Sequence, residues 1–143
     1  MKDPKTAVQT SFYSLLDGNV TIGGSAVGVG DKMNPPDGYP QITLNDWTEI
    51  DDSDKSSFGS ELTFTTHVYD RQEQDNGSRA DLYDIVGQMK QLVRTRPQSV
   101  DLSPDFKLIW LIIDGELSLP KELTDTHITF GRQVRFRMAI EQL

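Results

Sequence analysis

The strongest constraint on the fold is a change of hydrophobic period between residues 60 and 93. In SELTFTTHVYDR, residues 60–71, apolar or β-branched side chains recur at every second position from Leu62 to Val68. That period is typical of a strand with one buried face. Residues 78–93 then carry apolar side chains at spacings of three and four, the period of a helix with one apolar stripe. We therefore expect a strand followed by a helix that packs against the same sheet.

The segments on either side predict further strands and one more helix. Residues 3–19 form a helix, in which Asp3 can cap the N-terminus and Pro4 suits the first turn. Residues 20–31 form two short strand pieces broken by a Gly-Gly pair. Residues 41–50 form a strand that continues into the alternating strand through the polar segment 51–59, which makes a long hairpin.

Within these elements the pattern assigns side chains to faces and caps to helices. In the strand 41–50, alternation places Trp47 on the face opposite Ile42 and Leu44. In the helix after residue 77, Ser78 is the expected N-cap, and Asp81 three residues later resembles a capping box. Arg94, Arg96 and Pro97 are expected to end that helix.

The C-terminal third contains two more strands of different character. Residues 106–119 are apolar on both faces between Leu108 and Ile113, so this strand is either central or meets another subunit with one face. A long connection is expected from Asp114 to Thr126. The last strand, residues 127–143, places alternate apolar residues inward and Arg135 and Arg137 on the opposite face.

The order of these elements predicts an α+β fold. We expect one domain over residues 1–143, with a mostly antiparallel β-sheet and two α-helices packed on one face.

Composition and charge exclude several classes of function. The 143 residues include no cysteine, which excludes disulfides and zinc-thiolate sites. The net charge is −8, and residues 31–84 hold thirteen of the 22 acids but four of the 14 bases. Such a chain binds phosphates poorly and is expected to repel DNA. The longest apolar run is six residues, and residues 1–12 lack the apolar run of a secretory signal, so we expect a soluble protein.

No catalytic, metal or cofactor site emerges from the motifs. The charged stretch from Val68 to Met89 is a strand end, a polar loop and a capped first helical turn. His67 and His127 lack the neighbours of a triad or the spacing of a zinc site. The segment starting at Asp52 has no glycine at the sixth position of a calcium loop and no glutamate at the twelfth. We expect a protein that is not an enzyme and needs no cofactor.

Three groups of residues remain as candidates for assembly. The arginines near the C-terminus either balance acids on an outer sheet face or meet another subunit, where arginine is enriched. The two tryptophans are core residues or interface anchors. The acidic hairpin tip, Asp51 to Ser57, could become ordered against a partner. The candidate contacts with other subunits or a tail tube are Trp47, Asp51, Asp52, Asp54, Lys55, Trp110, Arg132, Arg135 and Arg137.

The layout as a whole resembles the tail terminator, or tail completion, family of long-tailed bacteriophages and gene transfer agents. The resemblance covers nearly the full chain. It is carried by the following segments in order: AVQTSFYSLL, a glycine-broken segment, YPQITL, a Ser/Asp-rich tip, ELTFTTHVYDR, ADLYDIVGQMKQLV and the closing RQVRFRMAI. The chain departs from the family pattern in the long connection from Asp114 to Thr126 and in the unusually apolar LIWLII.

The resemblance implies a structural protein that forms a ring, usually of six subunits. Such a ring sits on the end of the tail tube, stops its growth and offers a surface to the head connector. The implied partners are other copies of the chain, the tail tube protein and the connector or stopper protein. DNA passes through the channel without specific binding. The implied location is the tail or neck of a virion, after assembly in the host cytoplasm and away from membranes.

Three other interpretations remain open at this stage. The chain could be another neck protein of such a particle, such as a stopper or head-completion ring. It could be a small α+β ligand-binding domain or enzyme, although the sequence offers no set of ionisable groups for one. It could also be a protein-binding module that forms no ring.

Overall fold

A computed structural model describes residues 3–30, 38–51, 53, 58–73, 78–94 and 100–143 of the chain. The elements in chain order are α1 (Lys5–Leu16), β1 (Thr21–Ile22), β2 (Ser25–Ala26), β3 (Gly28–Gly30), β4 (Gln41–Asp51), β5 (Gly59–Glu73), α2 (Ala80–Val93), β6 (Phe106–Leu123) and β7 (His127–Gln142).

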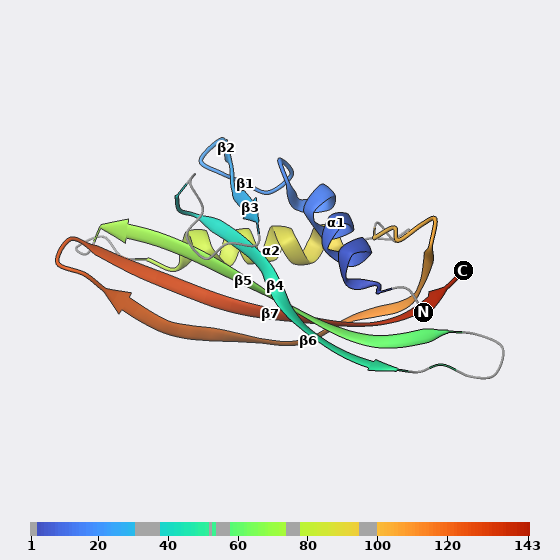
Figure 1. The fold of residues 1–143 in the computed structure, drawn as a ribbon. Helices are drawn as coiled ribbons and strands as arrows, with labels where there is room; N and C mark the ends of the chain where they lie inside the picture. The colour runs from blue at the N-terminus through green and yellow to red at the C-terminus, as the bar shows by residue number, and fades with distance from the viewer. Residues whose placement is uncertain (1–2, 31–37, 52, 54–57, 74–77, 95–99) are drawn as a thin grey trace.

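A sheet of five strands forms one layer, and the two helices form the other. The strand order is β3-β4-β5-β7-β6, and every neighbouring pair is antiparallel except β3 with β4. Both helices lie on the same side of this sheet (Figure 1). A second sheet is the small β1-β2 hairpin, which turns at the Gly-Gly pair. The predicted α+β fold, with its mostly antiparallel sheet and both helices on one face, is therefore confirmed.

The core lies between the sheet and the helices and follows the predicted periodicities. The alternating apolar residues of β5 and β7 that face the helices are almost fully buried. Phe12 of α1 meets the rings of Phe64 and Phe136 edge-on, with centroids 4.8 and 5.4 Å away. Such edge-to-face pairs stabilise a core beyond the area that they bury. One aromatic cluster thus joins the first helix to the two central strands.

The predicted face of Trp47 is wrong, because β4 contains a β-bulge. Leu44 pairs with Thr66 of β5, but Asp46 pairs with Thr65, so Asn45 is an extra residue in the ladder. One extra residue reverses the faces of all the residues that follow it. Trp47 therefore lies on the helix face, where its ring stacks on Phe64.

The apolar strand near the C-terminus is not central. β6 is the last strand of the sheet and pairs only with β7 among the described residues. The expected connection from Asp114 to Thr126 is wrong, because β6 continues to Leu123 and the turn spans only residues 124–126. The ladder between β6 and β7 shifts register at three places, of which the first is at Ile109. The other two contain Gly115 and Pro120, so these residues fit within one long strand.

The start of α2 differs from the predicted capping box. The N-cap residue is Arg79, and no side chain caps it. Ser78 lies one residue earlier, and its Oγ accepts a hydrogen bond from the backbone N–H of Ala80 at 3.2 Å. Arg94 is the C-cap, as the predicted end of the helix required. Arg96 and Pro97 lie outside the described residues.

Candidate assembly surface

The polar corner between β5 and α2 is held by one glutamine side chain. Gln72 Nε2 donates hydrogen bonds to Asp70 Oδ2 at 2.8 Å and to the Ser78 carbonyl at 2.7 Å. Its Oε1 accepts the Ser78 backbone N–H at 2.6 Å. The corner thus closes through local hydrogen bonds of the kind that organise turns. This geometry agrees with the interpretation of the charged stretch as a turn.

Asp70 is the buried acid of this corner and is 5% exposed. Burial raises the pKa of Asp70, the hydrogen bond from Gln72 opposes that rise, and the charge of Asp81 adds to it. A shallow hollow of about 420 Å³ lies beside it. Among the described residues, no group of three or more metal-binding side chains could hold an ion. The one hydroxyl among the described residues that line this hollow is that of Ser78, and it accepts the backbone N–H of Ala80.

The face of the sheet away from the helices carries two of the predicted arginines. Arg137 Nε lies 3.5 Å from Glu61 Oε1, and its guanidinium carbon lies 5.7 Å from the ring centroid of Trp110. Arg135 Nε lies 3.9 Å from Asp114 Oδ2. Both guanidinium groups thus lie near an acid of the same chain, and both side chains remain about half exposed. Such exposed pairs add little to stability, so the fold does not depend on them.

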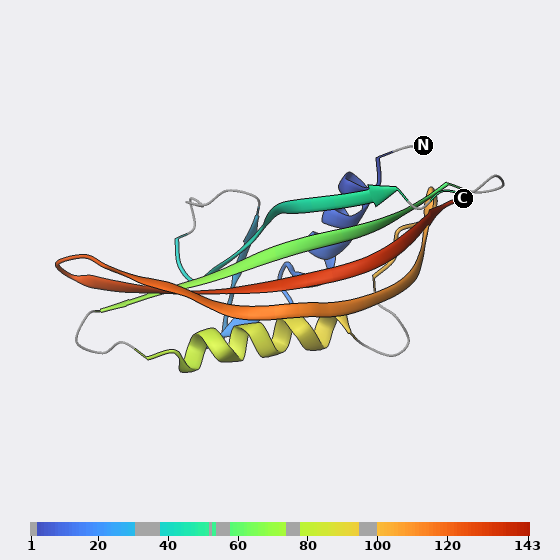
Figure 2. The same ribbon diagram turned by 90° about the horizontal axis from the view of Figure 1, so that it is seen from below.

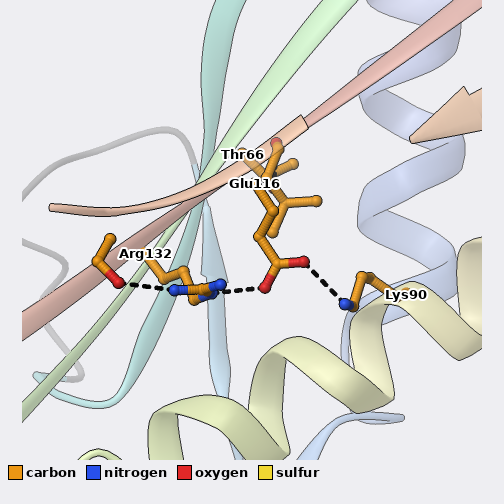
Figure 3. A network of polar contacts seen from close by, with 6 residues as sticks. Thr66, Lys90, Glu116 and Arg132 are labelled. Atoms are coloured by element: carbon orange, nitrogen blue, oxygen red, sulfur yellow. Dashed lines mark hydrogen bonds and ion pairs between the residues drawn. The ribbon is translucent and has the colours of Figure 1, made fainter. Parts of the chain in front are cut away.

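Arg132 belongs to the other face, so the three arginines do not form one patch. Glu116 of β6 accepts hydrogen bonds from Arg132 Nε and from Lys90 Nζ of α2, the latter at 2.8 Å. Arg132 also donates to Ser118 Oγ at 2.7 Å. Figure 3 shows this chain of contacts running from the strands to the helix. Burial tends to raise the pKa of Glu116, but the two cations outweigh it and hold the pKa below its usual range.

The hairpin tip is described only at its base. Asp51 Oδ1 accepts the backbone N–H of Ser53 at 3.0 Å, and hydrogen bonds with Ser53 hold the pKa of Asp51 below its usual range. The Oγ of Ser53 accepts the N–H of Gly59 at 3.2 Å, which ties the two sides of the tip together. Asp52, Asp54 and Lys55 lie outside the described residues. Their role at the tip stays a prediction.

Trp110, a candidate contact from the sequence, is 39% exposed, and other exposed apolar side chains were not predicted. Ile109 next to Trp110 is 49% exposed. Leu117 on the same strand and Ile50 on β4 are also exposed, Ile50 at 66%. For β6, the run of residues that is apolar on both faces around Trp110 could have predicted this exposure. No sequence pattern could have predicted the exposure of Ile50, because the face on which it lies depends on the bulge at Asn45.

A second hollow lies beside the first helix. It has a volume of about 600 Å³ and lies between α1 and the segment that leads into β6. Its walls include Thr10 and Ser14 of α1 and the acids Asp101 and Asp105. The Asp101 carboxylate already accepts hydrogen bonds from Ser103, which hold its pKa below the usual range.

No described helix is long and apolar enough to cross a membrane.

Comparisons with known proteins bear on the fold. No protein-family model matches the sequence, and no curated protein matches it. A chain in the solved structure titled "Virion of native gene transfer agent (GTA) particle" has a similar fold, with a TM-score of 0.77 and 19% sequence identity. The match covers 99% of this chain and 99% of that chain. The two chains therefore share one fold from end to end.

Proposed function

We propose that this chain is a structural protein of a virion or virus-like particle, and specifically a tail terminator. In this proposal it forms a ring that caps the tail tube, ends its polymerisation and joins the tail to the head connector. DNA passes through the ring without specific binding. The protein acts by assembly and carries out no reaction.

The observation that carries the proposal is the end-to-end likeness to a chain of a gene transfer agent virion. Because the match spans 99% of both chains, it covers the whole fold and not one part of it. Fold alone does not determine function, so the surface must also suit assembly. The long apolar edge strand and the half-exposed arginines of the outer face supply such a surface. The net charge of −8 suits a channel that DNA must leave freely.

Removing the gene from the producing particle tests the proposal. Without a terminator the tail tube should keep growing, so tails longer than normal are expected in electron micrographs. Restoring the gene should restore uniform tail length. Tails of normal length that fail to join heads would instead identify a stopper or head-completion protein. Normal, joined tails would overturn the proposal.

The mass of the purified protein provides a second test. Native mass spectrometry over a range of salt and protein concentration should show a closed ring, with six subunits expected. A ligand-binding domain should instead remain monomeric and gain melting temperature from its ligand.

A further inference from the structure

The five-stranded sheet has two open margins among the described residues. β6 pairs with β7 on one side only. β4 is covered by β3 only at Gln41–Thr43, so its later part, Trp47–Asp51, pairs only with β5. Figure 2 shows β4 and β6 on opposite sides of the two central strands. An open margin presents unpaired backbone N–H and C=O groups that can pair with another strand.

The two open margins lie at the same level of the sheet. The ladders place Leu108 beside Ile140, Ile140 beside Ser60, and Ser60 beside Asp51. At the other end of this stretch, the same ladders join Ile113 to Trp47 through Phe136 and Phe64. The apolar run of β6, Leu108–Ile113, is therefore level with the open part of β4.

The remaining part of β6 lies where β4 is already covered. The ladders place Leu117 and Leu119 of β6 level with Thr43 and Gln41 of β4, the residues that β3 covers. Just beyond this level β6 has a bulge that contains Pro120. A proline on an edge strand lacks the backbone N–H that pairing requires. The segment Leu108–Ile113 also contains a register shift, at Ile109, but it contains no proline and is apolar throughout.

Both open margins expose apolar side chains on the helix-free face. Trp110 lies level with Ile50 through Ala139 and Glu61, so the two side chains point to the same face. Ile50 is 66% exposed and Trp110 is 39% exposed. Exposed apolar residues on an edge strand favour pairing with another chain.

The strand directions fit a contact between two copies. Because β4-β5, β5-β7 and β7-β6 are all antiparallel, β4 and β6 run in opposite directions. A second copy with its helices on the same side would therefore present β4 antiparallel to β6 of the first. This contact joins two different surfaces, so it can repeat from copy to copy and close a ring.

We propose that the sheet continues from one copy to the next, with Leu108–Ile113 of β6 paired antiparallel to Trp47–Asp51 of β4 in a second copy. The inference rests on the proposed function in taking the partner to be another copy of this chain. In the level register, Trp110 of one copy lies directly opposite Ile50 of the next. Directly opposed residues have Cβ atoms about 4.5–5.5 Å apart, which a disulfide can bridge with a small shift.

Cysteine cross-linking tests this pairing, because the chain has no cysteine of its own. Trp110→Cys and Ile50→Cys are made as separate proteins, mixed in equal amounts and oxidised mildly. Since pairing raises the effective concentration of the two thiols, we expect at least about tenfold more heterodimer than from a control mixture. The control mixture replaces Ile50→Cys with Tyr83→Cys, whose parent residue is 51% exposed on α2. Circular dichroism of each variant checks the fold.

The outcomes separate this inference from the proposed function. Disulfide dimers of Trp110→Cys alone would indicate that β6 pairs with β6 of a second copy, which overturns the inference. A heterodimer yield no greater than that of the control overturns it as well. If native mass spectrometry still shows a ring in that case, the proposed function stands without this contact. The reverse case is a high heterodimer yield together with tails that stay normal and joined after the gene is removed. That result would overturn the proposed function and leave the contact between copies in place.

Discussion

The indole ring of Trp47 lies flat against the ring of Phe64, with centroids 4.0 Å apart and planes 9° from parallel. Phe64 is fully buried and also meets Phe12 of α1 edge-on. The stack therefore connects β4 to the aromatic cluster beneath the first helix. It depends on the bulge at Asn45, which turns Trp47 to the helix face.

We expect Trp47→Leu to lower the free energy of unfolding by about 1–2 kcal/mol, because it removes an aromatic pair and leaves part of its space unfilled. Urea unfolding followed by far-ultraviolet circular dichroism measures the change. Trp110→Leu is the matched control, measured at a concentration where the protein is monomeric. Trp110 lies on the exposed edge strand, so its replacement should change stability by less than about 0.5 kcal/mol. Equal losses in the two variants would show that the stack contributes nothing specific.

The sequence predicts the parts of this fold that local periodicity determines. The alternation in β5 and the spacing of three and four in α2 assigned the core residues of both elements correctly. The bulge at Asn45 was not predictable, because an extra residue appears only when two strands are paired. The face of Trp47 and the exposure of Ile50 both depend on that pairing.

The position of β6 at the edge of the sheet could not be predicted from the sequence either. An apolar run on both faces is compatible with a central strand and with an edge strand that meets a partner. Strand order is a property of the whole sheet, so the sequence left both alternatives open. Arg132 was grouped with Arg135 and Arg137 by closeness in sequence, although alternation separates its face from theirs in β7.

Glu116→Gln should destabilise the protein at neutral pH by an amount on the order of 1 kcal/mol, because Glu116 accepts hydrogen bonds from two cations at a partly exposed site. The pKa of Glu116 is lowered in the folded state, so its contribution is present above the unfolded pKa. The contribution is lost as the pH falls through the folded pKa. Urea unfolding at several pH values should show the two proteins converging in acid.

Glu122→Gln is the matched control for this effect, since Glu122 is an exposed glutamate of the same strand. Its replacement should change stability by less than about 0.5 kcal/mol at neutral pH. A difference between wild type and Glu116→Gln that stays constant from neutral to acid pH would contradict the role of the ionised carboxylate.

Asp70→Asn should have the opposite dependence on pH. The pKa of Asp70 is raised in the folded state by burial, so ionisation of this carboxyl opposes folding. Its contribution is fully present below the unfolded pKa and is lost as the pH rises through the folded pKa. The asparagine variant should therefore gain stability over wild type as the pH rises, and the two should agree in acid. Urea midpoints across the acid range measure this.

Asp101→Asn provides a control of opposite sign. Hydrogen bonds from Ser103 lower the pKa of Asp101, so that variant should be less stable than wild type at neutral pH and converge with it in acid. If Asp70→Asn followed the same course as Asp101→Asn, burial could not be the cause of the shift at Asp70.

The double variant Arg135→Glu with Arg137→Glu should abolish ring or tail assembly and leave the fold intact. Both side chains are about half exposed and near acids of their own chain, so stability should change by about 1 kcal/mol or less. Reversing two charges on a surface that meets a partner disfavours association far more. Native mass spectrometry measures the ring, and circular dichroism measures the fold.

A charge swap separates the two possible roles of Arg137. In Glu61→Arg with Arg137→Glu, the pair within the chain is kept, although its direction is reversed. If Arg137 serves only to balance Glu61, the swap should assemble as wild type does. If Arg137 faces a second copy or the tail tube, the swap should assemble as poorly as Arg137→Glu alone, because the partner then meets the wrong charge. We expect the second result, and normal rings from the swapped protein would remove Arg137 from the assembly surface.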